Sequence, residues 1–331
     1  MFKETLKQFF PNSLILDAAL KFPITPEGWE VTMPDQTECR FHEKDFWLIL
    51  NLQDMLTGKP GKMPQELKQI HNYYQHWAPL DRIIVIVWPQ GIAEVWPNES
   101  FHVVEFSTHQ YNTWQSYSKE QDVLREAFSI DNKDFKYNFV CMNRIKKPHR
   151  QILYDRVSSF NTGNCSLQSA GIELETPGLD YATYDHQYNN LVNLLSLKSA
   201  FNTSFFSVIT ESQFIEQYGI ISEKTFNAVV AGHPFMLCAH RGAINQLKEY
   251  GFETWDSLFN EIYDEVKEPR RIDDMIFDNL AWFDTKLSAE DMLELTMLHR
   301  DTIDHNRNFF LEEFGSKQKD WLQKQLLNVW S

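Results

Sequence analysis

The stretch at 204–252 constrains the fold more than any other part of the chain. Its first segment, 205–209, is apolar and rich in β-branched and aromatic residues, which predicts a buried strand. Ser222 is a favourable N-cap for a helix that begins at the next residue, and Gly232 is a typical helix end. A second apolar run at 234–238 predicts another strand, with a further helix after it. This βαβα pattern is typical of parallel sheets, which bind ligands at the carboxyl ends of their strands.

The rest of the chain also alternates between strand and helix patterns. Apolar runs predict further strands at 14–17, 46–52, 82–88, 102–106 and 137–142. Helical periodicity occurs at 65–77, 118–128, 151–160, 191–201, 255–266, 272–283, 288–314 and 317–330, whereas 161–190 predicts a long loop. The polar segment 129–136 separates two halves, so we expect an α/β domain at 1–130 and a second at 131–331 that ends in helices.

Composition excludes several classes of protein. No run approaches the ~18 apolar residues of a membrane span, and the N-terminus lacks the features of a signal peptide. The four cysteines are far apart, which is typical of free thiols in a reducing compartment, so we expect a cytoplasmic protein. The net charge of −15 disfavours non-specific binding to nucleic acid, although it leaves room for a local basic cleft. The chain has no phosphate-binding glycine loop and no histidine and cysteine cluster, so we expect neither a cofactor nor a required metal.

A basic loop follows the strand predicted at 137–142. Five basic side chains occur within seven residues, directly before a predicted helix: Arg144, Lys146, Lys147, His149 and Arg150. Cations at a strand end, together with the free N–H groups of a helix start, can bind a diphosphate. The alternative is a basic turn that is simply solvated.

Two acids occur at the matching ends of the later elements. Glu211 follows the strand at 205–209, and Glu223 begins the next helix, beside Lys224. A carboxylate in such a place can accept hydrogen bonds from the hydroxyls of a ribose. The alternative for Glu223 is an ordinary first-turn residue that the helix dipole favours. Lys224 opposes that dipole, and a ligand phosphate would explain its presence.

These residues carry a resemblance to a known family. The segment TESQFIEQYGIISEKTFNAVVAGHPFMLCAHRGAINQL resembles the donor-binding region of GT-B glycosyltransferases, and it is most similar to the fucosyltransferase-like pattern. The segment FVCMNRIKKPHRQIL resembles the other half of that site, and similar small proteins are encoded by tailed phages and bacteria. The resemblance covers 137–265 and departs from the pattern in the insertion at 161–190. It implies two Rossmann-like domains with an interdomain cleft, the first on the acceptor side and the second binding the nucleotide sugar.

The resemblance also implies roles for individual residues. Glu223 would bind the donor ribose, and cations would neutralise the diphosphate without a metal. The implied donor site comprises Arg144, Lys147, Arg150, Glu211, Ser222, Glu223, Lys224 and Thr225. Among these, Glu211 would shape the sugar or ribose end, and Thr225 would donate to a phosphate.

An inverting enzyme of this class needs a base that takes the proton of the acceptor hydroxyl. The candidates lie at the ends of strands in the N-terminal half: Asp17, Asp54 and His109. The alternative for each is a capping or turn residue.

We therefore expect a glycosyltransferase that moves a sugar from a nucleotide diphosphate sugar to an acceptor hydroxyl. The acceptor could be a glycan, or a hydroxymethylated base of phage DNA that is flipped out of the helix and modified in the host cytoplasm. A non-catalytic α/β binding protein is the remaining alternative, because a fold does not determine a function.

Overall fold

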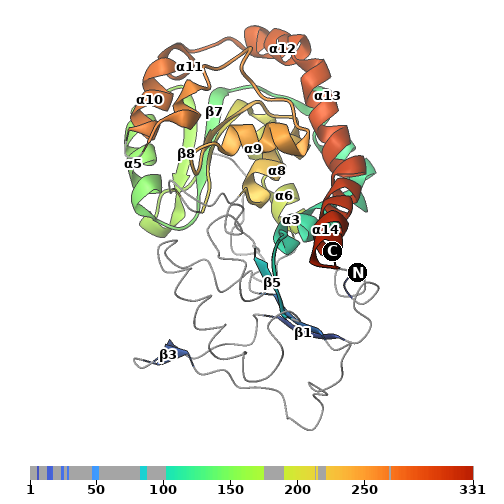
Figure 1. Ribbon diagram of the computed structural model, residues 1–331. Coiled ribbons are helices and arrows are strands. Elements are labelled where there is room, and N and C mark those ends of the chain that lie inside the picture. The colour runs from blue at the N-terminus through green and yellow to red at the C-terminus, as the bar shows by residue number, and fades with distance from the viewer. Residues whose placement is uncertain are drawn as a thin grey trace. The chain divides into compact units, whose positions relative to one another are not determined.

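The structure is a computed structural model that describes residues 6, 13–17, 24–25, 28–29, 47–51, 83–87, 102–174, 190–212, 214, 221–267 and 270–330 (Figure 1). The chain forms two compact units. The first comprises residues 1–108 and 318–331, and the second comprises residues 109–317. Both units contain a parallel sheet, so the mixed α/β class expected from the sequence is confirmed.

The first unit contains a four-stranded parallel sheet in the order β1 (Ser13–Asp17), β4 (Trp47–Asn51), β5 (Ile83–Val87) and β6 (His102–Glu105). These are the four strands predicted for the N-terminal half. Ile84, Ile86 and Val104 are fully buried, as expected for the apolar runs of parallel strands. A short antiparallel pair, β2 (Ile24–Thr25) and β3 (Gly28–Trp29), belongs to the same unit.

The second unit contains a parallel sheet that positions the candidate site. Its strands are β7 (Tyr137–Asn143), β8 (Gly163–Leu167), β9 (Ser204–Thr210) and β10 (Phe235–Cys238), in the spatial order β8-β7-β9-β10. The chain moves outward from β7 to β8 and then returns past β7 to β9. The direction of winding therefore reverses between β7 and β9. In open α/β sheets, ligands bind at such a switch point, outside the carboxyl ends of the strands.

The helices that follow these strands begin and end where local chemistry requires. α5 (Pro148–Val157) follows β7 and starts with proline, which suits the first helical turn. α8 (Glu223–Ala231) begins after Ser222, whose hydroxyl accepts from the Lys224 N–H, and it ends at Gly232 in the left-handed conformation. Both ends of α8 were predicted from the sequence. α9 (Ala243–Tyr250) is the further helix predicted after β10, and it ends at Gly251, which is also left-handed.

Other sequence predictions need correction. The helix predicted at 118–128 corresponds to α4 (Gln121–Ala127), which begins three residues later, whereas α3 (Thr108–Ser118) was not predicted. The helix expected at 191–201 is split into α6 (Asn190–Ser196) and α7 (Lys198–Asn202). β8 lies in the segment that was expected to be a loop. The strand was not predicted because its sequence, GNCSL, lacks the apolar run of a typical buried strand. The helix predicted at 65–77 lies outside the described residues.

The helices predicted at 272–283 and 288–314 are interrupted, whereas the last helix begins before its predicted start at 317. In order, the C-terminal helices are α10 (Arg271–Asp278), α11 (Leu280–Asp284), α12 (Ala289–Leu298), α13 (Arg300–Asn308), the π-helix η8 (Phe309–Glu313) and α14 (Phe314–Trp330). The segment 255–266 contains only the 3-10 turn η7 (Ile262–Glu265). Side chains replace helical bonds here: Asn279 Oδ1 accepts from the Asn260 N–H at 2.8 Å, and Asn279 Nδ2 donates to the Asn260 carbonyl at 3.0 Å. These contacts join the segment 255–266 to the break between α10 and α11, which interrupts the helix expected at 272–283.

The polar segment 129–136, expected to join two domains, lies inside the second unit. Backbone bonds attach it to the segment before β9, from Asp134 N to Asn202 O and from Lys136 N to Thr203 O, both at 2.8 Å. The two compact units divide instead at 108/109 and 317/318. Residues 318–330 belong to the first unit, where Gln325 Nε2 donates to the Glu105 carbonyl at 2.8 Å and Gln325 Oε1 accepts from the Glu105 N–H at 3.1 Å.

An aromatic core holds α8 in place. Phe226 of α8 stacks on Phe310 of the π-helix, with ring centroids 4.7 Å apart, and Phe252 and Phe314 pack against it.

The described cysteines Cys141, Cys165 and Cys238 are free thiols, as expected, and Cys39 lies outside the described residues. Within the part of the chain that the structure describes, no helix has both the length and the apolar character needed to cross a membrane.

Candidate functional site

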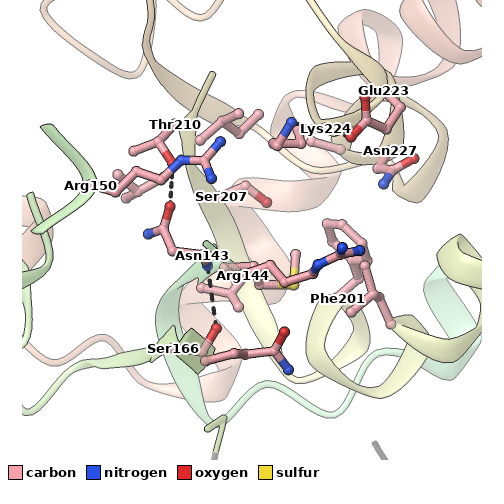
Figure 2. A pocket seen from close by; sticks show the side chains of 17 residues that line it. Asn143, Arg144, Arg150, Ser166, Phe201, Ser207, Thr210, Glu223, Lys224 and Asn227 are labelled. Carbon is pink, nitrogen blue, oxygen red and sulfur yellow. Dashed lines mark hydrogen bonds and ion pairs between the residues drawn. The ribbon is translucent and has the colours of Figure 1, made fainter. Parts of the chain in front are cut away.

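A pocket lies at the switch point of the second sheet. It has about 760 Å³ of empty space, a volume that includes open solvent at its mouth. Residues from the ends of β7, β8 and β9 line it together with α5, α7 and α8 (Figure 2). Its charged lining residues are Arg144, Arg150, Glu223 and Lys224, and its amides are Asn143, Gln168 and Asn227.

Hydrogen bonds between neighbouring strands form one wall of the pocket. The Thr210 hydroxyl at the end of β9 donates to the Asn143 side-chain oxygen at the end of β7, and the Asn143 N–H donates to the Ser166 hydroxyl of β8 at 3.3 Å (Figure 2). All three residues are buried. The bonds fix the ends of three strands relative to one another, so the side chains that follow those strands are rigidly placed.

Glu211 lies directly after β9 and is fully buried. One carboxylate oxygen accepts from the Ser222 N–H and the Thr225 hydroxyl, each at 2.8 Å, and the other accepts from the Ser222 hydroxyl. Glu211 therefore anchors the start of α8 to the end of β9. The hydroxyl protons of Ser222 and Thr225, which were expected to face the donor, point to this carboxylate instead. The geometry assigns all three residues a positioning role.

Glu223 is the first residue of α8, and a quarter of its side chain is exposed. Its Oε1 lies 3.1 Å from the Lys224 ammonium, and its Oε2 lies 2.8 Å from His109 Nε2. Burial alone would raise the pKa of Glu223, but Lys224 and the hydrogen bond from His109 outweigh it and hold that pKa well below its usual range. Because Glu223 is ionised, the imidazole Nε2 is the donor of this bond. The structure thus joins two residues that the sequence assigned to separate roles, ribose binding and catalysis.

The Lys224 ammonium lies among the side chains of Ser222, Glu211 and Glu223. Its ammonium donates to the Ser222 hydroxyl at 2.9 Å and lies 3.8 Å from the Glu211 carboxylate. Burial would lower the pKa of Lys224, yet the Glu223 and Glu211 carboxylates raise it above its usual value. Lys224 therefore remains a cation at any physiological pH.

Arg150 is the most unusual charged group of the pocket. It lies in the first turn of α5 and is only 4% exposed. Its guanidinium donates to two backbone carbonyls, Ile145 O at 3.1 Å and Glu211 O at 3.5 Å, and within the described residues its Nε has no hydrogen-bond partner and no carboxylate forms an ion pair with it. Burial lowers its pKa, although Glu211 and Glu223 pull it upward. A buried cation is normally paired, so this geometry leaves room for an anionic ligand.

The other basic residues of the loop surround this arginine. Lys147 Nζ donates to the Ser212 carbonyl at 2.6 Å, and burial, Arg150 and Lys224 together lower its pKa. His149 Nε2 donates to the Glu211 carbonyl at 3.0 Å, and burial lowers its pKa to about 4, so it is neutral near pH 7. Arg144 lines the pocket and extends toward Phe201 on the far wall (Figure 2).

The structure thus gathers most of the residues predicted for the donor site. Arg144, Arg150, Glu223 and Lys224 line the pocket, whereas Glu211, Ser222 and Thr225 hold the start of α8 from behind. Asp17 ends β1 in the first unit, its side chain is not among those described, and Asp54 lies outside the described residues.

Sequence reasoning missed the amides of the pocket. Asn143 is the last residue of β7, so its position beyond an apolar run was a usable signal. Asn227 follows Glu223 by one helical turn and shares its face of α8, where its side-chain oxygen accepts from the Tyr117 hydroxyl at 2.6 Å. Gln168 follows β8, the strand that was expected to be a loop, so nothing in the sequence indicated it.

The charge of the pocket contrasts with that of the chain. Three lining cations, Arg144, Arg150 and Lys224, face one lining carboxylate, Glu223, in a protein whose net charge is −15. Across the described residues, no group of histidine, cysteine, aspartate and glutamate side chains could hold a metal ion.

Comparison with family models, with curated proteins and with solved structures found no match to this chain.

Proposed function

We propose that the pocket of the second unit binds the diphosphate of a nucleotide sugar, and that the protein transfers this sugar to an acceptor hydroxyl. The observation that carries the proposal is the buried Arg150 guanidinium at the carboxyl ends of β7 and β9. Its hydrogen-bond partners among the described residues are neutral carbonyls, and a phosphate would supply the missing negative charge. The excess of cations among the described lining residues supports the same ligand class.

In this proposal, the protein contributes electrostatic stabilisation. When the bond between sugar and phosphate breaks, negative charge develops on the diphosphate, and Arg150, Arg144 and Lys224 stabilise it without requiring a metal. Glu223 stays ionised, and its exposed edge would accept hydrogen bonds from ribose hydroxyls. His109, held by Glu223, would accept the proton of the attacking hydroxyl. The two-domain GT-B architecture is part of this proposal, with the first unit binding the acceptor.

A nucleotide panel tests the donor site. UDP, GDP, CDP and ADP are compared with the corresponding monophosphates by thermal unfolding at constant ionic strength. At 100 times its dissociation constant, one of the diphosphates is expected to stabilise the fold by about 2.7 kcal/mol, a rise of about 5 °C in Tm. The monophosphate of the same base should shift Tm less, because it offers less charge to Arg150. The donor site is rejected if none of the four diphosphates shifts Tm.

Catalysis is tested separately with nucleotide sugars that contain the preferred base. Slow release of nucleoside diphosphate to water, faster with an acceptor, is expected of a transferase. Binding without release or transfer to glycans or to hydroxymethylated DNA would instead identify a non-catalytic binding protein. Duplex binding that weakens steeply with salt would indicate the DNA acceptor.

The His109→Gln variant separates chemistry from binding. Glutamine can still donate to Glu223, so the donor site and its Tm shift should be retained. It cannot accept a proton, so release of nucleoside diphosphate from the nucleotide sugar should fall sharply. His305→Gln, on the exposed face of α13, is the matched control and should keep full activity. Undiminished turnover in His109→Gln would remove His109 from the mechanism.

A further inference from the structure

A second pocket lies in the same unit, at the other end of α8. It has about 790 Å³ of empty space, counted out to its mouth, and is lined by residues of α4, of the segment 128–133, of α13 and by Gly232. Among the described residues that line it, Arg125, Lys133, Arg300 and Arg307 are basic and Asp304 is a carboxylate. None of these residues lines the first pocket.

Two of the cations are buried against backbone carbonyls. Arg307 is 9% exposed, and it donates from Nε to Val230 O at 2.9 Å and from Nη2 to Phe128 O at 3.3 Å. Lys133 Nζ donates to the carbonyls of Phe201 and Ala231, each at 3.3 Å. Within the described part of the chain, neither cation forms an ion pair with a carboxylate. Burial, and the mutual repulsion of the two groups, lower the pKa of Lys133 to about 7, whereas burial is the main reason that the pKa of Arg307 falls to about 10.

Helix capping explains only part of this arrangement. Cations at the C-terminus of α8 are favoured by the helix dipole, and Lys133 and Arg307 both bind carbonyls of its last turn. A single cation would satisfy that dipole. Capping also does not explain why Arg125 and Arg300 face the same cavity. These two are held at its edge, with Arg125 bonded to Asn308 and Glu312 and Arg300 bonded to Asp304.

We propose that this second pocket binds a polyvalent oxyanion of the phosphate class. Its oxygens would bond to Lys133 and Arg307 at the base and to Arg125 and Arg300 at the edge. Counting Glu312, which pairs with Arg125, the three arginines exceed the two carboxylates by one charge. Protonation of Lys133 on binding would raise this excess to two charges, which a doubly charged phosphate group would neutralise. The inference is independent of the proposed function, because it concerns different residues.

Inorganic pyrophosphate, titrated calorimetrically at constant ionic strength, is the probe. Because pyrophosphate also suits the first pocket, the titration uses the Arg150→Met background, in which that pocket is impaired. One site is expected there, and adding Arg125→Gln with Arg300→Gln should weaken it at least tenfold. Arg156→Gln with Arg270→Gln, two exposed arginines outside both pockets, changes the net charge equally and should leave the affinity within about twofold.

The Asp304→Asn variant gives an effect of opposite sign. It removes a lining carboxylate, so pyrophosphate should bind more tightly at the second pocket, and this gain cannot arise from misfolding. The proposal is overturned if the Arg150→Met protein binds no pyrophosphate, or if the control pair weakens binding as much as the pocket pair does. Because the pyrophosphate titration uses protein that lacks Arg150, failure of the first pocket would leave this result intact.

Discussion

The Arg150→Met variant is expected to bind the preferred nucleoside diphosphate about 100-fold more weakly than the wild-type protein. Methionine fills much of the volume of arginine but removes the buried charge and its donors. Truncating one partner of a buried, hydrogen-bonded charge pair costs about 2–5 kcal/mol of binding free energy, and about 2.7 kcal/mol corresponds to 100-fold. The thermal shift seen with the wild-type protein should therefore disappear at the same ligand concentration.

Calorimetric titration measures the affinity of each variant for the nucleoside diphosphate. The thermal shift of each variant is taken relative to its own Tm without ligand. Arg156→Met is the matched control, because Arg156 lies on the same helix but is exposed and pairs with Asp273. Arg150→Lys keeps the charge without the forked donors, so it should recover part of the affinity. If Arg150→Met binds as tightly as Arg156→Met, the diphosphate does not contact Arg150.

The Glu211→Gln variant is expected to lower the free energy of unfolding by about 3 kcal/mol. Glu211 is fully buried and accepts from the Ser222 N–H, the Ser222 hydroxyl and the Thr225 hydroxyl. A glutamine has one acceptor oxygen in place of two, and its NH2 group would face a donor at the second position. Removing the charge also leaves the Lys224 ammonium without one of its two nearby carboxylates. Breaking a buried ionic network in this way costs about 3–5 kcal/mol.

Urea denaturation, with the midpoint and slope compared between variants, measures this loss. Glu249→Gln is the control, because Glu249 is on the exposed face of α9 and the substitution removes the same charge. Its stability should stay within about 0.5 kcal/mol of the wild type. A Glu211→Gln protein as stable as this control would show that the start of α8 does not depend on the buried carboxylate.

The strands and the limits of α8 were predictable because the signals are local. A continuous apolar run predicts a buried strand wherever it lies, and the runs at 137–142, 205–209 and 234–238 match β7, β9 and β10. Ser222 and Gly232 act on backbone groups within one helical turn, so their effect does not depend on distant parts of the chain. The breaks within helices could not be predicted from such local signals. Asn279 interrupts a periodic segment through bonds to Asn260, which no pattern of spacing indicates.

The sequence predicted some residues of the candidate site but not the partners to which they bond. It predicted the basic loop at 144–150 and the pair Glu223 and Lys224 as ligand-binding groups, because each follows a predicted strand or opens a predicted helix. Their partners were not identified. Glu223 bonds to His109, and Glu211 turned out to hold a helix start, since hydrogen bonds between residues far apart in the chain depend on how the elements pack.

By itself, the sequence determined that the chain forms parallel sheets with helices between their strands, and it placed acids and cations at the ends of those strands. Strand and helix formation depend on periodicity and capping over a few residues, which can be read directly. Only the tertiary structure decided that the stretch around α8 carries two cationic pockets, one at each end. The charges of the second pocket come from α4, the segment before β7 and α13, and only packing brings them together. The same packing buried Arg150 away from any carboxylate partner in the described residues, which is the feature that carries the proposed function.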